Sequence, residues 1–129
     1  MDRAMELIRD ARTVAVVGVS SNPKRPSNEV ATYLQNQGFR VYMVNPRETE
    51  VLGQPAYASV SDLPEEVDIV DIFRRSEDVP PIVNDAIAAG AKTIWLQLDI
   101  SNEEAEACAR EAGLDVIVDR CTKIEHLKL

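Results

Sequence analysis

Short apolar runs alternate along the chain with longer segments in which apolar residues recur at helical spacing. Five runs are nearly continuous and rich in β-branched residues: 13–19, 40–45, 67–73, 92–98 and 114–119. Strands that are apolar on both faces are typical of a parallel sheet covered by helices on both sides. We therefore predict an α/β, Rossmann-like fold with a doubly wound parallel five-stranded sheet, in the order 3-2-1-4-5, and helices on both faces.

Helical spacing predicts a helix before the first strand and three further helices, at about 27–37, 80–90 and 101–113. In the last of these, "SNEEAEACAREAG", we expect a capping box in which Ser101 caps the helix and Glu104 reaches back. Cys108 falls at a spacing that predicts a buried small hydrophobic residue. Segment 46–66 has no clear period, so we predict an irregular excursion there with a short helical turn near Ser61–Leu63.

The length of 129 residues indicates a single domain, 1–129. The first dozen residues are too charged for a signal peptide, and no apolar run approaches the length that spans a membrane. We therefore expect a cytoplasmic protein. The two cysteines, Cys108 and Cys121, are too few for a disulfide framework or a zinc site.

The charge balance narrows the class of ligand. A formal net charge of −8 argues against nucleic acid and anionic membranes as partners, because both demand a basic face. Six of the 14 Lys and Arg residues nevertheless follow predicted strands, where ligands bind in such folds: Lys24, Arg25, Arg47, Arg74, Arg75 and Arg120. In the predicted order the ligand edge lies between the first and fourth strands. A basic rim at that edge predicts a small polyanionic ligand.

A dinucleotide site requires G-x-G-x-x-G after the first strand and an acidic residue at the end of the second. This chain has "GVSSNPKRP", with one glycine, and "VNPR", with Asn45 in place of the acid. Both departures count against NAD. Arg47 and the pair Lys24–Arg25 instead suit a nucleotide with an extra phosphate on its ribose. A pyrophosphate is expected at the start of the helix near residue 27.

Five stretches together resemble a known family: "VAVVGVSSNPKRPSNEVATYLQNQGFRVYMVNP", "VLG", "VDIVDIFRR", "GAKTIWLQL" and "DRCTKIEH". The chain is similar to the small stand-alone CoA-binding proteins, whose domain resembles the CoA-binding N-terminal domain of the succinyl-CoA synthetase α subunit. The resemblance implies that coenzyme A, or an acyl-CoA, lies across the carboxyl ends of the strands.

The same resemblance implies which residues contact each part of the ligand. The phosphates would meet the loop after the first strand, at Gly18, Val19, Ser20, Ser21, Lys24, Arg25, Pro26 and Ser27. The adenosine end, with its ribose phosphate, would meet Asn45, Pro46 and Arg47. The other wall would be formed by Phe73, Arg74, Arg75 and Val79. The pantetheine arm would meet Gln97 and Leu98.

No catalytic constellation can be assembled from the sequence. His126 is the only histidine and has no evident partner for nucleophilic or metal chemistry, and Asp68 and Asp71 are expected on opposite sides of the sheet. Cys121 is interpreted as a buried core residue, with a mixed disulfide to CoA as the alternative. We therefore predict a non-catalytic CoA-binding module. Two alternatives remain, an NADP-type oxidoreductase and a regulatory interaction domain without a ligand, and no protein partner is specified.

Overall fold

Seven strands form one sheet in the computed structural model, which describes residues 1–129. The strands are β1 (Thr13–Val17), β2 (Arg40–Val44), β3 (Glu50–Val51), β4 (Gln54–Tyr57), β5 (Ile69–Ile72), β6 (Thr93–Leu96) and β7 (Asp115–Ile117). Their order is β3-β4-β2-β1-β5-β6-β7, and every neighbouring pair is parallel except β3 and β4. The five predicted strands are all present.

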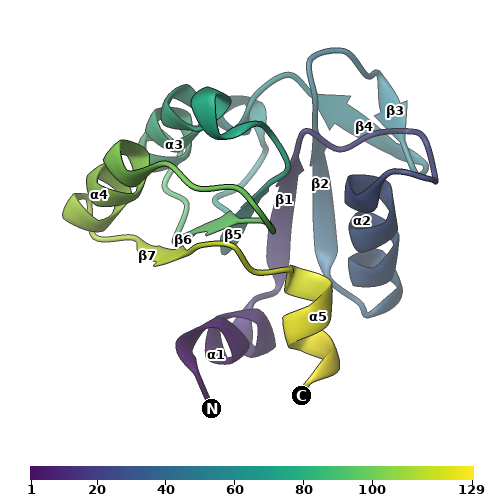
Figure 1. The fold of residues 1–129 in the computed structure, drawn as a ribbon. Helices are drawn as coiled ribbons and strands as arrows, with labels where there is room; N and C mark the ends of the chain where they lie inside the picture. Colours follow the sequence, from purple (N-terminus) through teal and green to yellow (C-terminus); the bar gives the residue numbers. More distant parts are fainter.

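Five helices cover this sheet on both faces (Figure 1). They are α1 (Arg3–Asp10), α2 (Pro26–Asn36), α3 (Val79–Ala88), α4 (Glu103–Glu111) and α5 (Thr122–Leu127), with 3₁₀ turns η1 (Val60–Asp62) and η2 (Ser76–Asp78). Helices α3 and α4 pack on one face, and α1, α2 and α5 on the other. The Rossmann-like α/β fold is thus confirmed. No helix has both the length and the apolar character needed to cross a membrane.

The predicted five-stranded order 3-2-1-4-5 is wrong. The run at 69–72 does not lie beside β2; it pairs with β1, in the register Val14 with Ile69. Segment 46–66 contains the strand that takes the place beside β2, because Met43 pairs with Ala56. Strand β4 is short, half exposed and contains Pro55, so it lacks the continuous apolar run of a central strand. The six parallel strands therefore follow the doubly wound order β4-β2-β1-β5-β6-β7.

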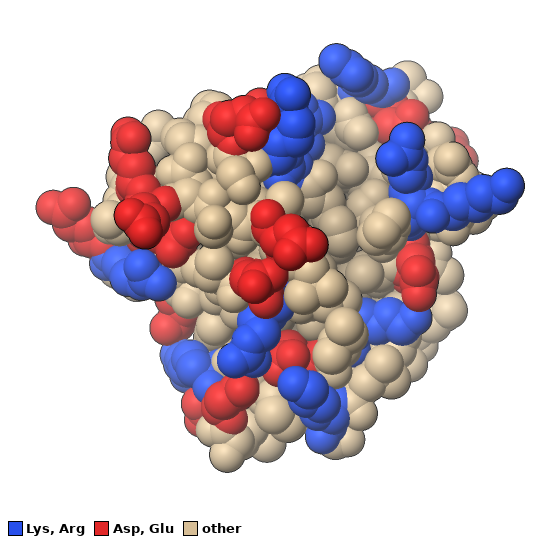
Figure 2. All heavy atoms as spheres, in the orientation of Figure 1, with Lys and Arg blue, Asp and Glu red and all other residues tan.

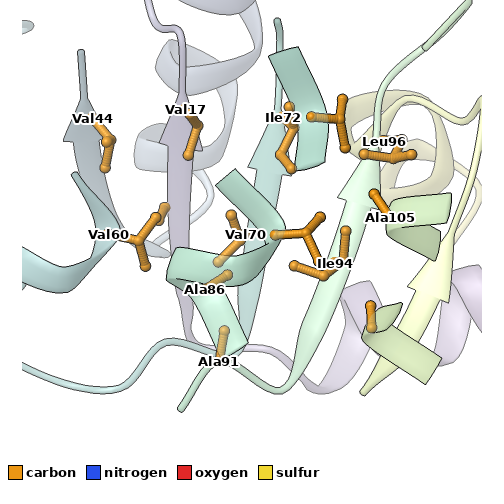
Figure 3. Packing of buried hydrophobic residues seen from close by; sticks show 14 of the residues in the cluster. Val17, Val44, Val60, Val70, Ile72, Ala86, Ala91, Ile94, Leu96 and Ala105 are labelled. Atoms are coloured by element: carbon orange, nitrogen blue, oxygen red, sulfur yellow. The ribbon is translucent and has the colours of Figure 1, made fainter. Parts of the chain in front are cut away.

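The core lies in two layers on either side of the central strands. Alternate residues of β1 point to opposite faces, so that Ala15 and Val17 pack under α3 and α4, whereas Val14 and Val16 pack under α1 and α2. Figure 3 shows the first layer, where Val70, Ile72, Ile94 and Leu96 meet Ala86 and Ala105 of the helices. All residues of β1, β5 and β6 are buried, which explains why these strands were visible in the sequence.

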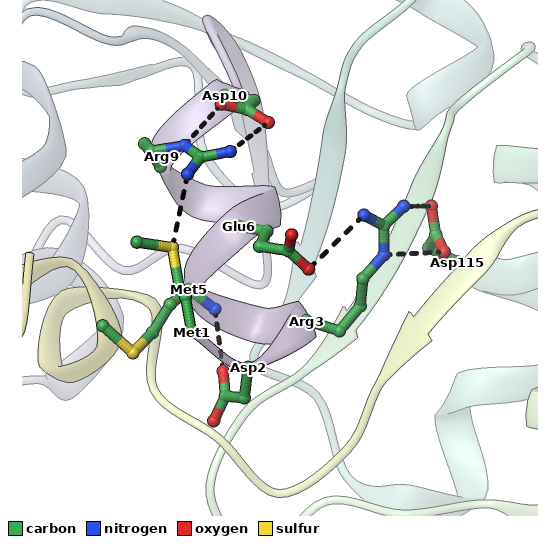
Figure 4. A network of polar contacts seen from close by, with 8 residues as sticks. All are labelled: Met1, Asp2, Arg3, Met5, Glu6, Arg9, Asp10 and Asp115. Carbon is green, nitrogen blue, oxygen red and sulfur yellow. Dashed lines mark hydrogen bonds and ion pairs between the residues drawn. The ribbon is translucent and has the colours of Figure 1, made fainter.

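Helix α1 is joined to the sheet by a polar network (Figure 4). Asp2 caps the helix by accepting a hydrogen bond from the Met5 amide at 3.0 Å. The Arg3 guanidinium donates to the Asp115 carboxylate of β7 at 2.9 Å. These contacts fix the amino-terminal helix against the last strand, at the end of the sheet where both termini lie.

Three local predictions for α4 are wrong. Asn102, not Ser101, is the N-cap, and its side chain accepts from the Ala105 amide at 3.0 Å. Glu106, not Glu104, reaches back to the cap, where it accepts from the Asn102 amide at 2.8 Å. Cys108 is exposed rather than buried, because the face of α4 that meets the core is centred on other residues, Ala105 and Ala109.

Candidate functional site

The strand order places the ligand edge between β1 and β5, not between the first and fourth predicted strands. Gly18 follows β1 at this point with a φ of +85°. A Cβ at this residue would lie 2.8 Å from Arg74 Cδ and 2.9 Å from the Phe73 carbonyl oxygen. Glycine is therefore required both by the backbone conformation and by the close approach of the loop after β5.

The loop from Gly18 to α2 is held by its own side chains. The Ser20 amide donates to Ser27 Oγ at 3.0 Å, and Asn28 Nδ2 donates to the Ser20 carbonyl at 2.8 Å. Asn22 Oδ1 accepts from the Lys24 amide at 3.0 Å. Arg25, the N-cap of α2, makes no side-chain capping bond, Pro26 carries no N–H, and the Asn28 and Glu29 amides both donate to the Arg25 carbonyl at 3.1 Å. The Ser27 amide is therefore the one in the first turn that stays available to an anion.

Three cavities meet at Gly18. The η1 cavity, of about 560 Å³, lies between the ends of β1 and β2, the segment 58–60 and the start of α3. The arginine cavity, of about 470 Å³, is bounded by Gly18, Arg47, Phe73, Arg74, Arg75 and Asp78. The Gln97 cavity, of about 570 Å³, is lined on one side by the loop before α2 and on the other by Gln97, Leu98, Ile100 and Cys121.

The basic residues of this edge differ in their partners. Lys24, Arg25 and Arg47 are exposed and make no ion pair with a carboxylate. Arg74 and Arg75 each lie 3.2 Å from the Asp78 carboxylate, and these contacts, with Arg75 the stronger, hold the pKa of Asp78 below its usual value.

Arg120 does not belong to this rim. Its guanidinium contacts Glu125 at 3.0 Å and Asp2 at 3.2 Å, on the α1 and α5 side of the molecule. Figure 2 shows Lys and Arg side chains projecting from the upper edge, over the loops that follow β1 and β2, whereas carboxylates gather over α4. The basic character of the edge therefore comes from the loops after β1, β2 and β5.

Most of the residues predicted for the site line at least one cavity: Gly18, Ser20, Arg25, Pro26, Ser27, Pro46, Arg47, Phe73, Arg74, Arg75, Gln97 and Leu98. Val19 and Val79 are instead buried in the core, and Ser21 and Lys24 are exposed outside the cavities. Asn45 positions the loop: its Nδ2 donates to the Val19 carbonyl, and its Oδ1 accepts from the Arg47 amide, both at 2.9 Å.

The sequence prediction missed one wall of the η1 cavity. Ala58, Ser59 and Val60 follow β4, and Pro81 and Ile82 lie on the first turns of α3 opposite them. These residues carry no charge and no motif. The segment 58–60 could have been placed at the ligand edge only if β4, the strand before it, had been predicted.

A buried polar cluster lies beneath the Gln97 cavity. Asp71, in the middle of β5, is fully buried, and burial raises the pKa of its carboxyl to about 7. Gln97 Nε2 donates to Asp71 Oδ1 at 2.7 Å, and Thr122 Oγ1 donates to Asp71 Oδ2 at 2.9 Å. Cys121, beside Thr122, is also buried, which raises the pKa of its thiol and keeps it protonated.

His126 lies away from these cavities. Its Nδ1 is 2.6 Å from Tyr33 Oη, and its ring packs edge-on against Phe39. The structure contains no group of three or more His, Cys, Asp or Glu side chains that could hold a metal ion. The edge itself presents the unpaired cations Arg25 and Arg47, which suit an anionic group.

Comparison with known proteins gives a consistent result. The sequence model of the family described as CoA binding domain matches residues 12–127. YneT of Bacillus subtilis (strain 168) is 36% identical over 121 residues, which cover 94% of this chain and 90% of that protein. A hypothetical protein from Pyrococcus horikoshii OT3 has a solved structure with a TM-score of 0.95 and 40% identity, over 98% of this chain and 89% of that chain.

A larger enzyme carries a related segment. The alpha subunit of ADP-forming acetate–CoA ligase II from Pyrococcus furiosus is 48% identical over 101 residues, 78% of this chain. The match covers 22% of that subunit, so this chain corresponds to about a fifth of it. The resemblance inferred from the five sequence stretches is therefore confirmed: this chain belongs to the CoA binding domain family and is homologous to the CoA-binding part of ADP-forming acetate–CoA ligases.

Proposed function

We propose that this chain binds coenzyme A, or an acyl-CoA, across the carboxyl edge of its sheet, and that its role is binding rather than catalysis. The observation that carries the proposal is the meeting of three cavities at Gly18, with the unpaired cations Arg25 and Arg47 beside them. CoA has a matching shape, because its phosphates lie between an adenosine end and a long uncharged arm.

In the arrangement that we propose, the adenine enters the η1 cavity, where Val44 and Val60 supply apolar surface. The ribose phosphate pairs with Arg47, whose position is fixed by Asn45. The pyrophosphate lies in the arginine cavity and at the free Ser27 amide in the first turn of α2, near Arg25. The pantetheine arm then extends into the Gln97 cavity toward Cys121.

Two features support a binding role rather than a catalytic one. No histidine lines any of the three cavities. Cys121 lines the Gln97 cavity, but burial raises the pKa of its thiol, which disfavours the nucleophilic thiolate. The ligase resemblance covers only the binding portion of those enzymes, so their activity is not assigned to this chain.

The test is isothermal titration of ligand-stripped protein with CoA, with acetyl-CoA and NADPH as comparators. We expect one-to-one binding of CoA and acetyl-CoA and at least tenfold weaker binding of NADPH. Saturable binding of NADPH alone would instead support the oxidoreductase alternative. If no nucleotide binds, the proposed function is wrong.

A further inference from the structure

Asp71 is a buried carboxyl group without a cation. It is 0% exposed, and its two hydrogen-bond partners, Gln97 and Thr122, are both neutral side chains. Burying a carboxylate without a compensating charge is costly, and an apolar side chain in the middle of a fully buried strand would avoid that cost. Packing in β5 therefore does not explain why this position carries an acid.

The hydrogen bonds of this cluster have a fixed direction. Above pH 7, where the Asp71 carboxyl is ionised, it only accepts hydrogen bonds, so the Gln97 amide turns its nitrogen toward Asp71, at 2.7 Å. Thr122 uses its one hydroxyl hydrogen on the other carboxylate oxygen, which leaves the Thr122 oxygen free to accept from the same Gln97 nitrogen at 3.3 Å. Both amide hydrogens of Gln97 are thus held inside the protein.

The orientation of the nitrogen determines that of the oxygen. Gln97 Oε1 accepts no hydrogen bond from the protein, and the only fully enclosed side-chain polar atom without a partner is elsewhere, on Glu48. The Gln97 side chain lines the Gln97 cavity beside Leu98 and Cys121. Its carbonyl oxygen is therefore the atom that remains open to a ligand there.

We propose that Asp71 is a positioning residue that, together with Thr122, fixes the Gln97 amide with its oxygen toward the cavity, so that the site selects a ligand group that donates a hydrogen bond. This inference rests on the proposed function. The pantetheine arm of CoA can present an amide N–H, a hydroxyl or the terminal thiol to the Gln97 oxygen, whereas a group that offers only acceptor oxygens, such as a carboxylate, would be repelled there.

The test is a double-mutant cycle on Asp71 and Gln97, measured by titration at pH 8. Gln97→Met keeps the length of the side chain and removes the amide, and Asp71→Val removes the carboxylate while keeping a strand-forming residue in β5. Each variant is titrated with CoA and with adenosine 3′,5′-bisphosphate, which shares the adenosine end and lacks the pantetheine arm.

We expect each single variant to weaken CoA binding roughly fivefold to tenfold, the effect of one lost hydrogen bond. The double variant should bind CoA as Gln97→Met does, because Asp71 acts only through Gln97. Binding of adenosine 3′,5′-bisphosphate should be unchanged in all three. Additive losses, equal losses for both ligands, or no loss of CoA binding would each overturn the inference while leaving the proposed function in place.

A second pair of variants covers the case in which Asp71→Val does not fold. Thr122→Ser keeps the hydroxyl and should bind CoA as the wild type does, whereas Thr122→Val removes it and should weaken CoA binding without affecting adenosine 3′,5′-bisphosphate. Equal behaviour of the two variants overturns the inference. If the wild-type protein itself does not bind CoA, it is the proposed function that fails.

Discussion

Arg47 is the residue whose role in the proposed complex can be isolated most directly. Its side chain has no carboxylate partner, it borders the arginine cavity, and Asn45 holds its backbone amide at 2.9 Å. A guanidinium in this position can pair with a phosphate through two parallel hydrogen bonds. CoA and dephospho-CoA differ only in the phosphate on the ribose, so the two ligands form a matched pair for this side chain.

We expect Arg47→Glu to weaken binding of CoA by at least tenfold and binding of dephospho-CoA by less than threefold. The reason is that reversal of the charge removes the ion pair with the ribose phosphate and adds a repulsion that acts mainly on this phosphate, since the pyrophosphate keeps Arg74 and Arg75 in the same cavity. Titration calorimetry with both ligands measures the difference. Arg110→Glu, on the exposed side of α4, makes the same charge change away from the site and should affect neither. Equal losses for CoA and dephospho-CoA would place the ribose phosphate elsewhere.

Asp78 has the opposite role at the same rim, because it occupies the cations that a phosphate would use. Its carboxylate lies 3.2 Å from both Arg74 and Arg75 and borders the arginine cavity. We expect Asp78→Asn to strengthen CoA binding several-fold at low salt, since the two arginines lose a competing anion and the cavity loses a negative charge.

Glu77→Gln is the control for Asp78→Asn, because Glu77 contacts Arg75 alone, at 3.5 Å, and should change the affinity less. Titrations at two salt concentrations check the electrostatic origin, since the gain should shrink as salt rises. Weaker CoA binding by Asp78→Asn would mean that the carboxylate itself accepts a hydrogen bond from the ligand.

At the scale of elements, the start of α4 is linked to the rim. Asn102 caps α4 through the Ala105 amide, and its Nδ2 donates to the Ser76 carbonyl of η2 at 3.0 Å. The turn η2 directly follows Arg75 and ends at Asp78. One side chain therefore fixes both the start of a helix and the turn that follows Arg74 and Arg75 and carries their partner Asp78.

We expect Asn102→Ala to lower the free energy of unfolding by about 1–2 kcal/mol, because it removes a helix cap and a side-chain hydrogen bond. Ser101→Ala is the matched control, since the Ser101 side chain makes no hydrogen bond. Its effect should stay within about 0.5 kcal/mol. Urea denaturation of the two variants measures the difference, and a larger loss for Ser101→Ala would restore the cap expected from the sequence.

The elements also show what the sequence reveals and what it does not. The central strands were predictable because both of their faces are buried, which leaves a continuous apolar run. Strand β4 was not, because it is half exposed and contains Pro55, and the wrong sheet order follows from that one omission. Ser101 and Asn102 both have capping side chains, and the contact with Ser76, distant in sequence, distinguishes them.

The candidate site likewise has a part that the sequence predicts and a part that depends on the fold. The position of the charged residues that follow β1, β2 and β5 was predictable, because each comes directly after an apolar strand in the sequence and therefore lies in a loop at the carboxyl edge of the sheet. The apolar wall at 58–60 and the cluster beneath Gln97 were not, because their function depends on which segments the fold brings together. Asp71 lies within the apolar segment that forms β5, and nothing in that segment distinguishes it from an ordinary buried strand.

At the scale of the whole molecule, Asp71 couples the stability of the fold to pH. Burial raises the pKa of its carboxyl from 3.8 to about 7 in the folded protein, so the folded state binds more protons than the unfolded state between these values. The contribution of this group to stability is therefore greatest below about pH 4 and is lost as the pH rises to about 7. Above pH 7 it stays constant, because the carboxyl is then ionised in both states.

We expect Asp71→Asn to remove this dependence. The amide has nearly the same shape and does not titrate, so the free energy of unfolding of the variant, relative to wild type, should rise on the order of a few kcal/mol between pH 4 and pH 7. Carboxyls whose pKa is lowered by their partners, such as Asp68 and Asp78, act in the opposite direction, but they are common to both proteins and cancel in the difference. Urea denaturation of both proteins at half-unit intervals of pH measures this difference. A constant difference across the range would mean that Asp71 is ionised throughout, in which case its hydrogen bonds to Gln97 and Thr122 outweigh the effect of burial.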